Sequence, residues 1–247
     1  MKKPSWPVML GLALLAASAV FYLAHYLLFR DAHHILIYLV GDVAFLPVEI
    51  LLVTLVVHRM LTRHEKQAML HKLNMVIGAF QSEVGAQLMR TLQRFDGSAA
   101  EIAGRLCVTR EWTARHYAQA HSTLGNYAPR IDPRAGDLVA LRDFLQQRRD
   151  FLLRLLENPV LLEHEHFTDL LWAVFHLTEE LAQRADLSHL TDTDATHLSG
   201  DIARAHKVLL REWLRYMGHM QKDYPYLFSL AVRTNPFDPA ARVEVTA

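Results

Sequence analysis

The chain has 247 residues, of which 26 are Lys or Arg and 26 are Asp or Glu, so its formal net charge at pH 7 is zero. This balance excludes the global basic excess that is typical of nucleic-acid-binding proteins, and we expect no nucleic-acid partner. A single cysteine, Cys107, excludes an intrachain disulfide framework. The fold must therefore be inferred from the pattern of apolar residues.

Two long apolar runs lie within the first sixty residues, from Pro7 to Phe29 and from Ile35 to Val57. A helix needs roughly 20 apolar residues, each rising about 1.5 Å, to cross a bilayer core. The sequence thus predicts a transmembrane helical hairpin at residues 1–60, with spans at about 7–29 and 35–57 and the lipid bilayer as partner. Ala17-Ser18-Ala19 imitates a signal cleavage site, but the apolar run continues past it and favours an uncleaved anchor.

Basic residues flank both ends of the hairpin. Lys2 and Lys3 precede the first span, and Arg59, Arg63 and Lys66 follow the second. Because such residues concentrate on the cytoplasmic side, we expect both termini in the cytoplasm and a multi-pass protein of the cell inner (plasma) membrane. The three residues after the second span are expected to contact anionic lipid headgroups.

Two acidic residues interrupt the second span. Asp42 and Glu49 are seven residues apart and so share one helical face. A charge near the bilayer centre costs roughly 2.5–3.5 kcal/mol, so these side chains need partners. On the first span Ser18, Tyr22 and His25 share a face at similar depths. In a hairpin, or in an oligomer of hairpins, we expect Tyr22, with His25 as a second candidate, to hydrogen-bond Asp42, and Ser18 to lie nearest to Glu49.

Three roles stay open for this intramembrane polar cluster. In the first, protonated carboxylates link the helices by hydrogen bonds. In the second, a homo-oligomer of hairpins places the acids around a wet axis that conducts cations or protons. In the third, the acids sense protons or a ligand through a change in hairpin packing.

After the hairpin, apolar residues recur every three or four positions, which predicts a long amphipathic juxtamembrane helix within residues 61–96. Gly78, Ser82 and Ala86 follow one another at four-residue intervals on it. Such a row of small residues lets another backbone approach closely. It is interpreted either as ordinary packing against the rest of the chain or as a self-association seam.

The remaining sequence predicts an all-α cytoplasmic helical bundle at residues 97–234 and a flexible tail at 235–247. Ser98 and Glu101 resemble a capping box, which opens a helix expected to reach about His121. Further helices are expected at 137–157, 161–185 and 196–222.

Motifs that carry chemistry are weak. Glu163-x-x-His166 has the spacing of a di-iron ligand pair, but such bundles need the motif twice. His176 and Glu180 fall on a polar helical face that we interpret as solvated, and His197 with Asp201 has a different spacing. No nucleophile elbow, phosphate loop or dinucleotide fingerprint occurs. We expect no catalytic residue, no bound metal and no cofactor.

The function expected from these features is a non-enzymatic one. A sizeable helical domain attached to a membrane hairpin favours a membrane-tethered signalling, regulatory or scaffolding protein whose bundle binds a cytoplasmic protein partner. The alternative is a small oligomeric cation or proton channel, or a transport accessory, that uses Asp42 and Glu49.

Overall fold

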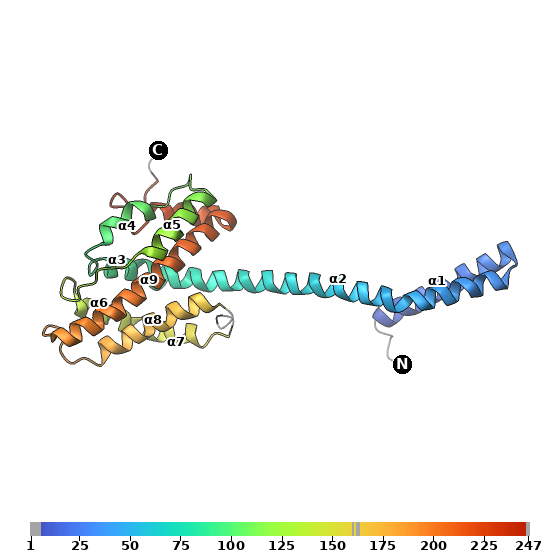
Figure 1. The fold of residues 1–247 in the computed structure, drawn as a ribbon, viewed down its shortest axis with the longest axis horizontal. Coiled ribbons are helices and arrows are strands. Elements are labelled where there is room, and N and C mark those ends of the chain that lie inside the picture. Colours follow the sequence, from blue (N-terminus) through green and yellow to red (C-terminus); the bar gives the residue numbers. More distant parts are fainter. Residues whose placement is uncertain (1–5, 160, 162–163, 246–247) are drawn as a thin grey trace. The chain divides into compact units, whose positions relative to one another are not determined.

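The computed structural model describes residues 6–159, 161 and 164–245, with the side chains of 7, 62–68, 70 and 71 excepted (Figure 1). The elements in this part are helices, and one isolated backbone bridge joins Asp96 to Ile131. The all-α class is thereby confirmed. The chain divides into two compact units, Met1–Lys66 and Gln67–Ala247.

The first unit consists of α1 (Trp6–Phe29) and the beginning of α2 (Ala32–Phe80). Val8–Phe29 and Ala32–Leu61 are each long and apolar enough to cross a bilayer, with mean hydropathies of 2.0 and 2.2. Neither segment is buried inside the protein, which distinguishes both from the core helices of a soluble domain. Two apolar helices that could be membrane spans are therefore present where the sequence predicts them.

The turn between α1 and α2 is formed by two residues. Arg30 adopts a left-handed φ of 50°, and its N–H donates to the carbonyl oxygen of Tyr26 at 2.8 Å. Asp31 Oδ1 accepts the N–H groups of His33 at 2.9 Å and His34 at 3.1 Å. These hydrogen bonds cap the N-terminus of α2. They also hold the pKa of the Asp31 carboxyl below its usual value, and the bond from His34 has the largest effect.

The juxtamembrane helix expected within residues 61–96 begins as part of α2. The structure continues α2 through Pro47 to Phe80, and then a π-helical turn, η1 (Gln81–Gly85), leads into α3 (Ala86–Gln93). The π-helical turn is a local insertion into an otherwise α-helical path. Hydrophobic periodicity alone does not predict it, because residues 80, 84 and 88 still point to one buried side.

The second unit contains the end of α2, η1, α3 and seven further helices. These are α4 (Ala99–Leu106), α5 (Ala114–Asn126), α6 (Leu138–Gln147), α7 (Arg149–Leu156), α8 (Glu165–Ala182), α9 (Asp192–Asp223) and α10 (Pro225–Arg233). The 32-residue α9 lies at the centre, in contact with α3, α5, α8 and α10 (Figure 1). Phe80 and Phe167 pack edge to face in the core, with ring centroids 5.4 Å apart.

Two expected helices are broken, and the expected capping box does not form. Ser98 begins α4 without a capping bond, because its hydroxyl donates to Asp96 Oδ1 at 2.7 Å. The helix expected to reach His121 ends at Leu106, and α5 follows after a loop. The helix expected at 137–157 is divided at Arg148, which leaves α6 and α7.

The start of the expected flexible tail is packed. Phe237 is buried against Trp213, with ring centroids 5.1 Å apart. Asn235 is also buried, and its amide donates to the carbonyl oxygen of Leu106 at 3.2 Å. The bundle therefore extends beyond residue 234, because the ring of Phe237 is part of its hydrophobic core.

Candidate functional site

The bundle has a groove between the α2–η1–α3 stretch and the helices α9 and α10. Its volume is about 940 Å³, near the upper end of the roughly 300–1,000 Å³ of small-ligand pockets. Its rim is apolar and solvent-exposed, with Met75, Tyr226, Leu227 and Leu230 as the large exposed side chains. We call it the α9–α10 groove.

The row of small residues expected on the juxtamembrane helix forms one wall of this groove. Gly78, Ser82 and Ala86 all line it. At Gly78 a Cβ atom would lie 3.0 Å from the hydroxyl oxygen of Tyr216, so α9 of the same chain approaches closely there. The first residue of the row thus serves intrachain packing, while Ser82 and Ala86 face the groove.

A buried amide in the groove wall has no hydrogen-bond partner. Gln81, in η1, is 6% exposed, and neither its Nε2 nor its Oε1 is hydrogen-bonded within the described part of the chain. Leaving a buried polar group unsatisfied costs about 1–3 kcal/mol. A ligand that supplied a donor and an acceptor would recover this cost, and π-helical turns are frequent at functional sites.

Gly85 explains why the Gln81 side chain can lie where it does. A Cβ at Gly85 would lie 2.2 Å from Gln81 Oε1, so the amide folds over the bare backbone of the π-helical turn. Sequence reasoning missed this pair. A Gln followed four residues later by Gly on a predicted helix is a weak signal, because it has meaning only once the π-helical turn is known.

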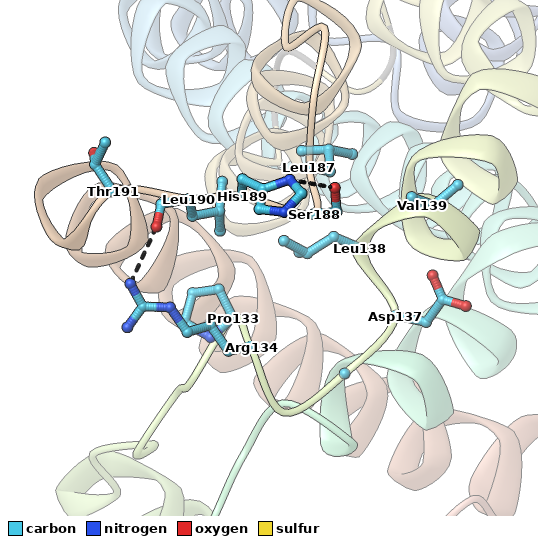
Figure 2. Close-up of a pocket in the computed structure, with 11 residues that line it drawn as sticks. Pro133, Arg134, Asp137, Leu138, Val139, Leu187, Ser188, His189, Leu190 and Thr191 are labelled. Atoms are coloured by element: carbon cyan, nitrogen blue, oxygen red, sulfur yellow. Dashed lines mark hydrogen bonds between the residues drawn. The ribbon is translucent and has the colours of Figure 1, made fainter.

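A second concavity, of about 760 Å³, lies between residues 133–139, a loop that runs into the start of α6, and the loop at 187–191. Figure 2 shows its lining, with Arg134 reaching across to the carbonyl oxygen of Leu190 at 3.2 Å. Arg134 also binds Asp192 Oδ1 at 2.7 Å. These bonds join the two loops, which gives the residues around this pocket a structural role.

A serine, a histidine and an aspartate meet beside this pocket, but not as a catalytic triad. His189 Nδ1 lies 3.0 Å from Ser188 Oγ and 2.9 Å from Asp186 Oδ2, so one nitrogen faces both groups (Figure 2 shows the Ser188 contact). In a triad the two ring nitrogens face the serine and the acid separately. The hydrogen bond from Ser188, followed by the other bonds to the carboxylate, holds the pKa of Asp186 far below its usual value, which makes it a poor base.

Comparison with known proteins identifies the family. One family model, described as "MJ1433, N-terminal helical domain", matches residues 2–61, and a second, "Uncharacterized protein MJ1433, C-terminal helical domain", matches residues 69–233. The protein MJ1433 of Methanocaldococcus jannaschii is 42% identical over 238 residues, which cover 96% of each chain. The chain belongs to the MJ1433 family. No solved structure matches it.

The MJ1433 family models divide the chain where the structure does. The gap between their matches, after residue 61 and before residue 69, contains the boundary between the units at residues 66 and 67. Apart from Thr234 and Pro236, the residues that line the α9–α10 groove lie within the range of the C-terminal family model, and Gln81 is among them.

The two acids of the second apolar segment, Asp42 and Glu49, do not meet the expected partners within one chain. Asp42, Glu49, Ser18 and Tyr22 are all exposed, and within the described residues no hydrogen bond joins either acid to the first helix. The expected Tyr22–Asp42 bond is therefore absent within the described part of a single chain, and its formation between copies stays a prediction. His25 instead stacks on His34, with ring centroids 6.3 Å apart, near the turn of the hairpin.

The expected headgroup contacts are described only in part. Arg59 is exposed at the end of the apolar segment of α2. The side chains of Arg63 and Lys66 lie outside those that the structure describes.

The expected di-iron ligand pair, Glu163 and His166, is also described only in part. Glu163 lies outside the described residues, and His166 is exposed.

The polar face expected on α8 is not simply solvated. His176 and Glu180 face His197 and Asp201 of α9, and Asp201 is 4% exposed. A repeated motif in the sequence could have revealed this group. A histidine is followed four residues later by an acid near the end of one helix, at His176 and Glu180, and again near the start of the next, at His197 and Asp201. The sequence-based interpretation treated each motif separately and missed their meeting.

Proposed function

We propose that this MJ1433-family protein is a non-enzymatic, membrane-tethered signalling, regulatory or scaffolding protein. Its helical bundle binds a cytoplasmic protein partner in the α9–α10 groove. The observation that carries the proposal is the Gln81 amide, buried in the groove wall without a hydrogen-bond partner in the described chain. An apolar groove with one unsatisfied polar group is what a specific docking site for a protein segment requires.

The membrane part of the proposal is supported by the hairpin. Its two apolar helices expose nearly all their side chains, which suits contact with lipid rather than with a protein core. Basic residues at 2, 3, 59, 63 and 66 favour a cytoplasmic location for both ends of the hairpin. The bundle, which follows α2 in the chain, is then cytoplasmic as well.

The occupant that fits the α9–α10 groove is an amphipathic helix of the partner. Apolar side chains of that helix would pack on Leu227 and Leu230, and its backbone would pass close to Ser82 and Ala86. A hydroxyl or amide side chain of the partner would satisfy Gln81. The exposed rim alone would bind weakly, so the buried amide supplies the specificity.

The assignment as non-enzymatic rests on the geometry of the candidate nucleophile. Ser188 donates to an acid of low basicity, and the neighbouring imidazole cannot relay a proton between them through its two nitrogens. The residues around the second pocket join loops to each other instead of converging on a substrate position.

Site-specific photocrosslinking in cells tests the proposed groove. A photoreactive residue at position 227 should crosslink one partner, whereas the same residue at position 139, an exposed apolar position outside the groove, should not. The purified partner should then bind the wild type at least about tenfold more tightly than Gln81→Ala or Leu230→Glu. Val139→Glu is the matched control. Equal binding by all four proteins would contradict the groove assignment.

The second candidate function is an oligomeric cation or proton channel. It is favoured by Asp42 and Glu49, which share a helical face and have no hydrogen-bond partner in the described part of their own chain. Several hairpins around a wet axis would provide them with water and with one another. Proton or cation flux into liposomes, lost in Asp42→Asn and Glu49→Gln, would establish this function. A monomeric state in nanodiscs would exclude an axial pore.

A further inference from the structure

Two histidines and two acids converge between α8 and α9 of the bundle. His176 and Glu180 are one turn apart near the end of α8, and His197 and Asp201 are one turn apart near the start of α9. The two helices are joined by a short loop and lie side by side (Figure 1). Residues four apart share one helical face, so the hairpin brings the two pairs together.

The four side chains form a closed ring. His176 Nε2 lies 3.8 Å from Glu180 Oε1 and 3.5 Å from Asp201 Oδ1. His197 Nε2 lies 3.5 Å from Glu180 Oε2 and 3.3 Å from Asp201 Oδ2. Ligand atoms held at about 2.0–2.2 Å from a tetrahedral zinc ion are separated by about 3.3–3.6 Å. The imidazole–carboxylate distances of 3.3–3.8 Å are close to this range, and one ligand atom each from His176, Glu180 and Asp201 lie within 4.8 Å of one another. Small side-chain rotations would therefore place the donor atoms around one ion.

An independent observation is the state of the Asp201 carboxylate. The side chain is 4% exposed, and its Oδ2 atom is buried without a hydrogen-bond partner in the described chain. His197 Nε2 lies 3.3 Å from this oxygen without forming a hydrogen bond to it, and a buried carboxylate oxygen without a hydrogen bond is unfavourable by itself. A cation placed between Asp201 and the imidazoles would satisfy it.

Neighbouring arginines hold the two carboxylates from outside the ring. Arg184 Nη1 donates to Glu180 Oε2 at 2.7 Å, and Arg204 Nη1 donates to Asp201 Oδ1 at 3.2 Å. These bonds leave Glu180 Oε1 and Asp201 Oδ2 for a ligand. The hydrogen bond from Arg184 also holds the pKa of Glu180 below its usual value, and hydrogen-bonded ligands of this kind are typical around metal ions.

We propose that His176, Glu180, His197 and Asp201 bind one divalent transition-metal ion of the zinc type, which links α8 to α9. Two imidazole nitrogens and two carboxylate oxygens suit zinc and its first-row neighbours, whereas calcium and magnesium prefer oxygen ligands alone. His176 and His197 are about half exposed, so the ion can be loaded and removed from solution. This site lies outside the α9–α10 groove and does not depend on the proposed partner.

The test is metal binding by the full-length protein in detergent micelles, purified without a polyhistidine tag and stripped with a chelator. Titration with Co²⁺ should give the visible absorption of a protein-bound ion at one equivalent per chain, and Zn²⁺ should displace it. Asp201→Asn should weaken binding of both ions by at least about tenfold. His166→Gln, which changes an exposed histidine of α8 outside the proposed site, should bind them like the wild type.

Circular dichroism of each variant shows whether it is folded. If Asp201→Asn is unfolded, His197→Gln replaces it, because a side chain that is 55% exposed can be changed without loss of the core. The proposal is overturned if the folded wild type binds no stoichiometric Co²⁺ or Zn²⁺. It is equally overturned if folded Asp201→Asn or His197→Gln binds the ions as tightly as the wild type, or if His166→Gln loses binding to the same extent.

Discussion

In the hairpin unit, Asp42 and Glu49 are exposed and without a hydrogen bond inside the described chain, whereas in the bundle unit Asp96 and Asp201 are buried beside histidines. The hairpin leaves the environment of its acids to whatever surrounds it, a bilayer or another copy. The bundle builds that environment from its own helices. The environment of a buried acid in the bundle is therefore set by tertiary packing within the chain. The environment of an acid in the hairpin depends on the surrounding bilayer or on another copy of the chain.

The strongest way to separate the two units is to damage the bundle core. Phe167 is fully buried against Phe80, so Phe167→Ala should lower the free energy of unfolding of the bundle by about 3–5 kcal/mol. Trp172→Ala, an exposed aromatic residue on the same helix, should change it by less than about 1 kcal/mol. Denaturant unfolding followed by circular dichroism measures both variants.

Membrane association of the same variants distinguishes the two units further. Under the proposed membrane anchor the hairpin would enter lipid without a folded bundle, so Phe167→Ala should remain with the membrane fraction after alkaline extraction. Release of Phe167→Ala into the soluble fraction, with Trp172→Ala retained, would contradict the proposed anchor.

A buried histidine makes the stability of the bundle depend on pH. His206 is fully buried with its Nε2 atom 3.8 Å from Asp96 Oδ2, and burial lowers its pKa to about 4, although Asp96 acts against this. The unfolded chain then binds a proton below about pH 6.5, and the folded chain does not. The free energy of unfolding should fall by about 3 kcal/mol as the pH drops from 6.5 to 4.

Thermal unfolding at several pH values checks this dependence. The loss should be largely absent in His206→Gln, which cannot titrate, and should persist in His116→Gln, which changes an exposed histidine. Desolvation raises the pKa of Asp96, but hydrogen bonds from Tyr127 and Ser98 outweigh it and lower the pKa below its usual value. Protonation of Asp96 therefore adds to the loss of stability only at lower pH. Parallel pH curves for wild type and His206→Gln would refute the assignment.

Two glycines of the bundle should respond to alanine with opposite signs. At Gly136 a Cβ would lie 2.5 Å from the ring of Phe95, which is buried and cannot move aside. We expect Gly136→Ala to lower the free energy of unfolding by about 1–3 kcal/mol. A Cβ at Gly200, in α9, would have no atom within 4 Å apart from its own helix backbone and chain neighbours. Gly200→Ala should therefore raise the free energy of unfolding by about 0.5–1 kcal/mol. Chemical denaturation measures the change in the free energy of unfolding for both variants. Changes in the same direction would show that the atoms around each glycine do not determine the effect of alanine.

The hairpin was the easier part to predict from sequence, because a membrane span imposes a composition that can be read without knowing any partner. The apolar segments Val8–Phe29 and Ala32–Leu61 lie close to the predicted spans. The expected hydrogen bond between Tyr22 and Asp42 does not form within the described part of a single chain, because shared depth and shared face do not fix the rotation of one helix against the other. A bond between copies of the chain stays a prediction.

In the bundle, helical periodicity predicted the class but not the polar contacts. Ser98 had the spacing of a capping residue, yet Asp96 competes for its hydroxyl. His176 and Asp201 are 25 residues apart, and only the packing of α8 on α9 brings them together. The π-helical turn at Gln81 leaves no periodic signal at all. Sites formed by long-range packing therefore stay hidden from a single sequence.

The smallest effect we expect lies in the hairpin turn. Arg30 has a left-handed φ of 50°, a conformation that strains residues with a Cβ by about 1 kcal/mol and does not strain glycine. Arg30→Gly should therefore be more stable than Arg30→Ala by about 1 kcal/mol, and the two variants lose the same charge. Unfolding of the purified protein in detergent, followed by a probe placed in the hairpin, measures the difference.

The bundle supplies the internal reference for this last comparison. Because Arg30 belongs to the first unit, both variants should leave the unfolding of the bundle, followed by Trp213 fluorescence, unchanged. An Arg30→Gly hairpin no more stable than the Arg30→Ala hairpin would mean that the turn relaxes to a negative φ. The N–H of residue 30 would then lose its bond to Tyr26, and Asp31 alone would set the start of α2.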